Sequence, residues 1–104
     1  MQEFIEVATV ADMPDSGKLS VEVGERYLLI VRVDGEYYCL DDVCTHDGGE
    51  LGEGELHGFC IACPRHGAQF DVRTGAALTM PATEPTGSHA VRIEGDRILV
   101  CLAL

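Results

Sequence analysis

The chain has 104 residues and a mass of 11.2 kDa, which suffices for one small domain over residues 1–104 and leaves no room for a separate catalytic domain. With 46% hydrophobic and 24% charged residues, its composition is that of a globular protein. The formal net charge of −11 repels phosphate backbones and anionic lipid, which argues against nucleic-acid or membrane binding. Without a secretory signal or a long apolar run, the chain is expected to be cytoplasmic.

The first part of the chain consists of short alternating runs bounded by turn residues, a pattern typical of antiparallel strands. The most apolar run, 26–33, ends at Asp34-Gly35, which is a strong two-residue hairpin signal. Residues 11–17 read as a loop or a single helical turn. Strands are predicted at 4–9, 18–23, 26–33 and 36–41.

The second part alternates loops with shorter strands, and none of its segments has a sustained helical period. Loops are predicted at 42–54, 63–67 and 80–87. Strands are predicted at 55–57, 59–62, 69–72, 89–94 and 97–102. Regular turn spacing of this kind favours a sandwich or barrel, so we predict an all-β domain of about eight to ten short strands.

Two glycine-rich loops each contain one cysteine and one histidine, Cys44 with His46 and Cys63 with His66. An odd total of five cysteines in a chain without an export signal argues against a disulfide framework and favours metal binding. Structural zinc sites usually pair like ligands at wider spacings, whereas each pair here is mixed. A two-iron centre explains the mixture, because each loop then supplies one ligand to each iron.

The motif Cys44-x-His46, sixteen residues, Cys63-x-x-His66 resembles that of Rieske-type [2Fe–2S] proteins. Gly48-Gly49 after the first pair, with Pro64 and Gly67 around the second, agrees with this resemblance. The resemblance implies a Rieske-type antiparallel β-sandwich with a small cluster-binding subdomain at about 42–82. It also implies one [2Fe–2S] cluster held by Cys44, His46, Cys63 and His66, with a proline-bearing loop, Met80-Pro81-Ala82, covering it.

Four positions depart from the high-potential, quinol-oxidising branch of that family. The two positions that carry an additional disulfide there are Gly49 and Arg65, and the two that carry hydroxyl donors are Ala68 and Phe70. Because donors to the cluster sulfurs stabilise the added electron, their loss lowers the reduction potential. Nearby acids, Asp41, Asp42, Asp47, Glu50, Glu53 and Glu55, act in the same direction. We therefore predict a potential near the lower end of the Rieske range, roughly −150 mV.

No nucleophile–base pair or mononuclear iron site is recognisable, so the protein is predicted to carry electrons rather than to catalyse a reaction. The resemblance implies a soluble Rieske ferredoxin that takes single electrons from an NAD(P)H-dependent flavoprotein reductase. It would pass them to a terminal Rieske non-haem iron oxygenase, such as an aromatic-ring hydroxylating dioxygenase. Two alternatives are the small Rieske subunit of an assimilatory nitrite reductase and a non-redox zinc-binding interaction module.

The remaining cysteines and histidines are interpreted as structural. Cys39, Cys60 and Cys101 lie in apolar strand patterns and are predicted to be buried small hydrophobes. His57 and His89 are expected to be ordinary surface or packing residues. The acidic stretch 41–55 is either a solvated loop or a surface that faces a basic partner. Arg65 either contributes to partner docking or pairs with a nearby acid.

Overall fold

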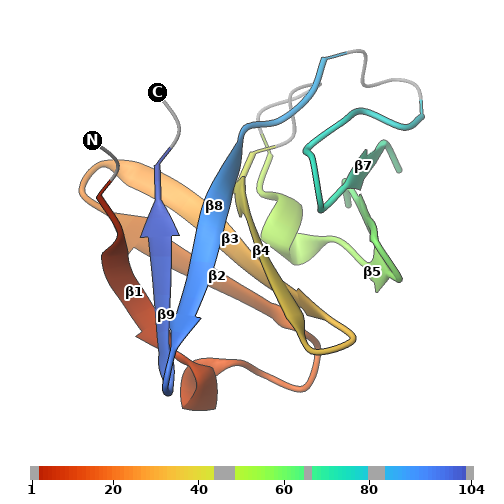
Figure 1. Ribbon diagram of the computed structural model, residues 1–104. Helices are drawn as coiled ribbons and strands as arrows, with labels where there is room; N and C mark the ends of the chain where they lie inside the picture. Colours follow the sequence, from red (N-terminus) through yellow and green to blue (C-terminus); the bar gives the residue numbers. More distant parts are fainter. Residues whose placement is uncertain (1–2, 44–48, 65–66, 80–83, 103–104) are drawn as a thin grey trace.

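The fold is seen in a computed structural model that describes residues 3–43, 49–64, 67–79 and 84–102. Within these ranges, nine strands form two antiparallel sheets of six and three strands (Figure 1). The six-stranded sheet has the order β1-β9-β8-β4-β3-β2, and the smaller one has the order β5-β6-β7. The strands are β1 (Ile5–Thr9), β2 (Lys18–Val23), β3 (Arg26–Val33), β4 (Glu36–Asp41), β5 (Leu56–His57), β6 (Cys60–Ala62), β7 (Gln69–Asp71), β8 (Ser88–Glu94) and β9 (Arg97–Cys101).

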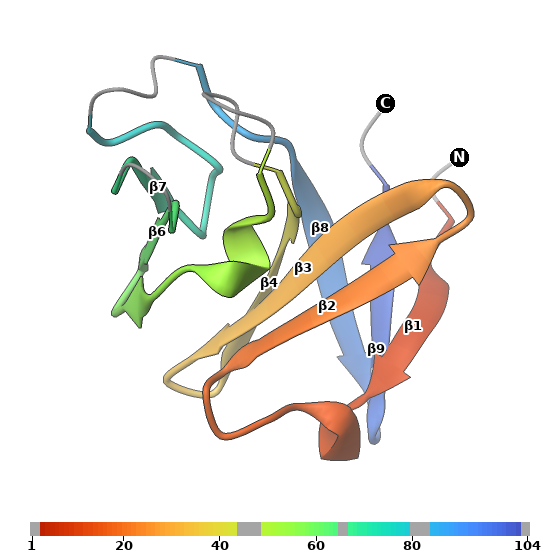
Figure 2. The same ribbon diagram turned by 180° about the vertical axis from the view of Figure 1, so that it is seen from behind.

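Strand β8 joins the two halves of the large sheet. Its first two residues, Ser88 and His89, pair with β4, whereas the five residues 90–94 pair with β9. The β2–β3 hairpin therefore crosses in front of β9 and β1 (Figure 2). Between these two layers lies a core cluster to which β3 contributes Leu28 and Ile30 and β9 contributes Ile98 and Val100. The curled six-stranded sheet is thus one half of the fold, with a core of its own.

The small sheet packs against the other face of β3 and β4. Its core cluster contains Leu29 and Val31 of β3, together with Leu51, Ile61 and Phe70 of the chain between β4 and β8. Successive residues of a strand point to opposite faces, so β3 has a buried core on both sides. This double burial explains why β3 is a nearly continuous apolar run instead of an alternating one.

The predicted all-β class, built from antiparallel sheets, is confirmed. The strands at 18–23, 26–33 and 36–41 occupy the predicted residues, and each of the others differs by one residue at one end. The predicted hairpin turn has positive φ at both central residues, 52° at Asp34 and 80° at Gly35, as a tight antiparallel hairpin requires. Two single 3₁₀ turns are present: η1 (Val10–Asp12) begins one residue before the predicted loop or turn at 11–17, and η2 (Leu51–Glu53) lies within the predicted loop at 42–54.

Among the described residues, none of the helices has the length and apolar character needed to span a bilayer.

Candidate metal centre in the loop-bearing layer

One of the four predicted ligands, Cys63, lies within the described residues, whereas Cys44, His46 and His66 lie outside them. Cys63 directly follows β6 and is only 1% exposed. The turn after it is closed by two backbone hydrogen bonds: Cys63 N–H donates to Ala68 at 2.7 Å, and Gly67 N–H donates to Cys63 at 2.9 Å. The second ligand loop thus begins and ends at backbone positions that are firmly held.

The surroundings of Cys63 are apolar. Ala68 and Phe70 are fully buried in the same cluster, and neither side chain carries a hydrogen-bond donor. A sulfur ligand at this position is therefore shielded from water on the side of the small core. This donor-poor wall fits an iron–sulfur cluster that has few side-chain hydrogen bonds to its sulfurs.

The first ligand loop is closed at its base by Asp42, which is 6% exposed. Asp42 Oδ1 accepts a hydrogen bond from the Gly52 backbone N–H at 2.7 Å, and Oδ2 accepts one from Ser20 Oγ at 3.0 Å. A Cβ at Gly52 would lie 2.6 Å from Ser20 Oγ, so a larger residue there would force the Ser20 side chain to move. The carboxylate thus ties both ends of the segment 42–52 to each other and to β2.

The far end of the first loop is fastened by Lys18, the single lysine of the chain. Its ammonium donates to the Gly52 carbonyl at 3.1 Å and to the Gly54 carbonyl. Gly54 packs directly on the backbone of β6, where a Cβ would overlap the Ala62 carbonyl oxygen. The end of the first ligand loop is therefore held against the strand that leads into the second.

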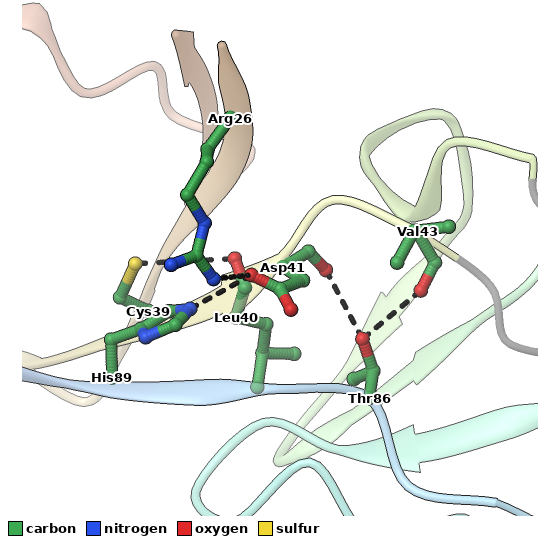
Figure 3. Close-up of polar contacts among 7 residues, drawn as sticks. All are labelled: Arg26, Cys39, Leu40, Asp41, Val43, Thr86 and His89. Carbon is green, nitrogen blue, oxygen red and sulfur yellow. Dashed lines mark hydrogen bonds and ion pairs between the residues drawn. The ribbon is translucent and has the colours of Figure 1, made fainter. Parts of the chain in front are cut away.

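The start of the first loop is braced by a part-buried polar network at the end of β4 (Figure 3). Asp41 Oδ1 lies 2.8 Å from His89 Nε2 and 3.2 Å from Arg26 Nη2. The His89 side chain is 2% exposed, so of the two predicted roles, surface or packing, it has the second, with a polar contact to Asp41 that was not predicted. Sequence reasoning missed the network because its members come from three strands, β3, β4 and β8.

Some of the acidic residues predicted to lie near the cluster make structural contacts. Asp41 and Asp42 accept the hydrogen bonds described above, so they are not free charges facing the ligand loops. Glu50, Glu53 and Glu55 are exposed, whereas Asp47 and Arg65 lie outside the described residues.

The three cysteines that were predicted to be structural differ in burial. Cys39 and Cys101 are buried, but Cys60 is only half-buried, so its prediction as a buried hydrophobe was wrong. Desolvation, with a smaller contribution from the Asp41 charge, raises the pKa of the Cys39 thiol to about 12. Cys39 is therefore a neutral core side chain, as predicted. His57 is exposed, as predicted, and its Nε2 lies 2.9 Å from Glu55 Oε2.

The structure so far defines a class: a small antiparallel β domain in which the two segments that carry the Cys/His pairs are braced against one small sheet. A model of the Rieske [2Fe-2S] domain matches residues 3–101, and the chain belongs to that family. The predicted cofactor, a [2Fe–2S] cluster, is confirmed with it. This favours iron–sulfur over zinc chemistry.

Individual relatives agree with the family assignment. The ferredoxin component of a naphthalene 1,2-dioxygenase system from Pseudomonas aeruginosa is 35% identical over 102 residues, which are 98% of each chain. Among solved structures, the ferredoxin of carbazole 1,9a-dioxygenase from Nocardioides aromaticivorans IC177 matches with a TM-score of 0.90 and 29% identity, covering 96% of this chain and 98% of that one. A chain from the complex of reduced oxygenase and oxidized ferredoxin in carbazole 1,9a-dioxygenase matches with a TM-score of 0.87 and 34% identity, covering 97% and 96%. The prediction of a ferredoxin-type electron carrier that is not itself an enzyme is confirmed.

Proposed function

We propose that Cys44, His46, Cys63 and His66 hold the [2Fe–2S] cluster, one cysteine and one histidine coming from each loop. The support is the mixed Cys/His spacing, the buried position of Cys63 and the bracing of both loops onto one small layer. We also propose that residues 1–104 are a single domain in which about 42–82 form the cluster-binding subdomain. The separate three-stranded sheet at 56–71 supports that division.

The proposed role is one-electron transfer from an NAD(P)H-dependent flavoprotein reductase to a terminal Rieske non-haem iron dioxygenase. The observation that carries this role is the end-to-end match to ferredoxin components of dioxygenase systems, including one solved in a complex with its oxygenase. Those names favour the role over that of a nitrite reductase small subunit. A cytoplasmic location, where thiols such as Cys39, Cys60 and Cys101 stay reduced, belongs to the same proposal.

The bound cluster would supply reversible uptake of one electron, and the chain's own residues would position it and tune it. Cys63 would present its thiolate from a tight, backbone-bonded turn, which limits reorganisation when the charge changes. Asp42 and Lys18 would keep the first loop in register with the second. Because Ala68 and Phe70 give no hydrogen bond to sulfur, the midpoint potential is proposed to lie near roughly −150 mV.

Reconstitution with purified components tests this function. A mixture of NADH, a flavoprotein ferredoxin reductase and a Rieske oxygenase with an aromatic substrate should turn over when the protein is added and stop when it is omitted. Gel filtration with the oxygenase should show exchange between free and bound protein. Tight stoichiometric binding to a sirohaem subunit would instead identify the nitrite reductase alternative. Failure to donate electrons to any such oxygenase would overturn the proposal.

A further inference from the structure

Thr86 lies at the meeting point of three segments that surround the proposed cluster site. It is 4% exposed and lies two residues before the start of β8, next to Gly87. Its Oγ1 is 3.1 Å from the Val43 carbonyl oxygen and 3.4 Å from the Asp41 carbonyl oxygen (Figure 3). A hydroxyl carries one proton, so it donates to one of these two carbonyls at a time, and the shorter contact is to Val43.

The backbone around Thr86 is packed closely on both sides. Thr86 N–H donates to the Gly75 carbonyl at 2.8 Å, and Asp41 N–H donates to the Gly87 carbonyl at 2.8 Å. A Cβ at Gly75 would overlap the Thr86 carbonyl oxygen, and one at Gly87 would overlap the Asp41 carboxylate. Residues 86–87 are thus closely packed between the end of β4 and the turn after β7, and hydrogen-bonded to both.

Thr86 matters for function because its shorter hydrogen bond goes to the Val43 carbonyl. Val43 is the last residue before Cys44, one of the proposed ligands. Because a peptide unit is planar, a hydroxyl that holds the Val43 carbonyl also holds the plane of the peptide bond to Cys44. The potential of an iron–sulfur cluster depends on the hydrogen bonds to its sulfurs and on its exposure to solvent, both of which follow from loop geometry.

We propose that Thr86 is a positioning residue for the cluster: its hydroxyl locks the base of the first ligand loop to the segment that follows the third loop, and this lock helps to set the reduction potential. The inference rests on the proposed ligand set. The Arg26–Asp41–His89 network braces the same strand end at Asp41, whereas the Thr86 hydroxyl reaches Val43, the residue next to the proposed ligand Cys44. Neither composition nor periodicity singles out this threonine.

The test compares three variants of the full-length, cluster-loaded protein with the wild type. Thr86→Val keeps the shape of the side chain and removes the hydroxyl, whereas Thr86→Ser keeps the hydroxyl. Val100→Ala creates a cavity in the core of the large sheet, away from the ligand loops, and serves as the control for lost stability. Midpoint potential, EPR g values, iron and sulfide content, and the rate of iron release to a chelator are measured for each.

We expect T86V to shift the midpoint potential and the g values beyond replicate scatter, and to release iron about fivefold faster, as loss of about 1 kcal/mol implies. T86S and V100A should keep the wild-type potential, although V100A unfolds at a lower temperature. T86V isolated without iron also supports the proposal if its far-UV circular dichroism is that of the wild type and T86S is fully loaded.

Three results would overturn the proposal: a wild-type potential in loaded T86V, an equal shift or equal cluster loss in T86S, or an equal shift in V100A. A different failure concerns the ligand set alone. If the wild type itself lacks two irons, two sulfides and a Rieske EPR signal, the proposed ligands are wrong whatever the variants show.

Discussion

The six-stranded sheet and the loop-bearing layer are stabilised in different ways. The sheet has long ladders, such as the six paired positions of β3 and β4, and an apolar cluster between its layers. The smaller layer also has an apolar cluster, but its strands have only two or three residues, and polar contacts and glycine-to-backbone packing help to join its segments. Strand β3 serves both regions, with Leu28 facing one core and Leu29 the other.

This comparison indicates that the large sheet is a scaffold, whereas the small layer positions the ligand loops; we call it the holder. A scaffold tolerates many apolar side chains, because burial is roughly proportional to area and has no direction. A holder requires particular atoms at particular places, because hydrogen bonds and close backbone approaches are directional. Substitutions in the two regions should therefore differ in kind as well as in size.

The largest effect is expected from Cys63→Ser. Loss of the thiolate should abolish the cluster, so that the protein is isolated colourless, without a Rieske EPR signal, while its far-UV circular dichroism still shows the large sheet. Cys60→Ser is the matched control in the neighbouring strand and should keep the cluster, because Cys60 is half-buried and outside the ligand motif. A Cys63→Ser protein with an unchanged visible spectrum would remove Cys63 from the ligand set.

The two faces of β3 supply the next test. Leu28→Ala and Leu29→Ala each remove a fully buried side chain and should each lower the free energy of unfolding by about 2–5 kcal/mol, measured by urea titration. Only Leu29→Ala should also speed the release of iron to a chelator, because Leu29 packs against the core that contains Cys63. Equal rates of iron release in Leu28→Ala and Leu29→Ala would mean that both core clusters affect the cluster site equally.

Close packing between the two ligand-bearing segments is tested by Gly54→Ala. An added Cβ would overlap the Ala62 carbonyl oxygen, so β6 must move, and we expect a loss of about 3 kcal/mol in unfolding free energy together with faster iron release. Gly58→Ala adds a Cβ in open space at a φ of 58°, and should cost about 1 kcal/mol with no effect on iron release. The comparison fails if Gly58→Ala weakens iron retention as strongly as Gly54→Ala.

The smallest effect concerns the pH dependence of the large sheet. Because burial raises the pKa of Cys39 to about 12 from an ordinary 9.0, the folded protein keeps a proton that the unfolded chain loses. The stability associated with this thiol is fully present below pH 9 and is lost as pH rises toward 12, by about 1.4 kcal/mol per pH unit. Cys39→Ala should flatten urea-unfolding free energies over pH 9–10.5. Parallel profiles for the two proteins would contradict the raised pKa.

Strand positions could be predicted well because the signals for them are local. The alternation in 18–23, the apolar run in 26–33 and the Asp34-Gly35 turn each lie within a few residues, and each strand lies where it was expected. The same holds for the ligand motif, whose residue types and spacing are enough to indicate the family. Cys60 shows the limit of such patterns, since its apolar neighbours indicated a burial that the thin three-stranded sheet does not provide.

By itself, the sequence indicated an all-β domain through its strand periodicity, and its Cys/His spacing carried the resemblance that implied a Rieske-type electron carrier. Both signals are properties of neighbouring residues. Only the tertiary structure decided which polar groups hold the ligand loops. Ser20 reaches Asp42 across 22 residues, Lys18 reaches Gly52 across 34, and His89 reaches Asp41 across 48. Such contacts depend on how the sheets fold back on each other, and no local pattern contains that information.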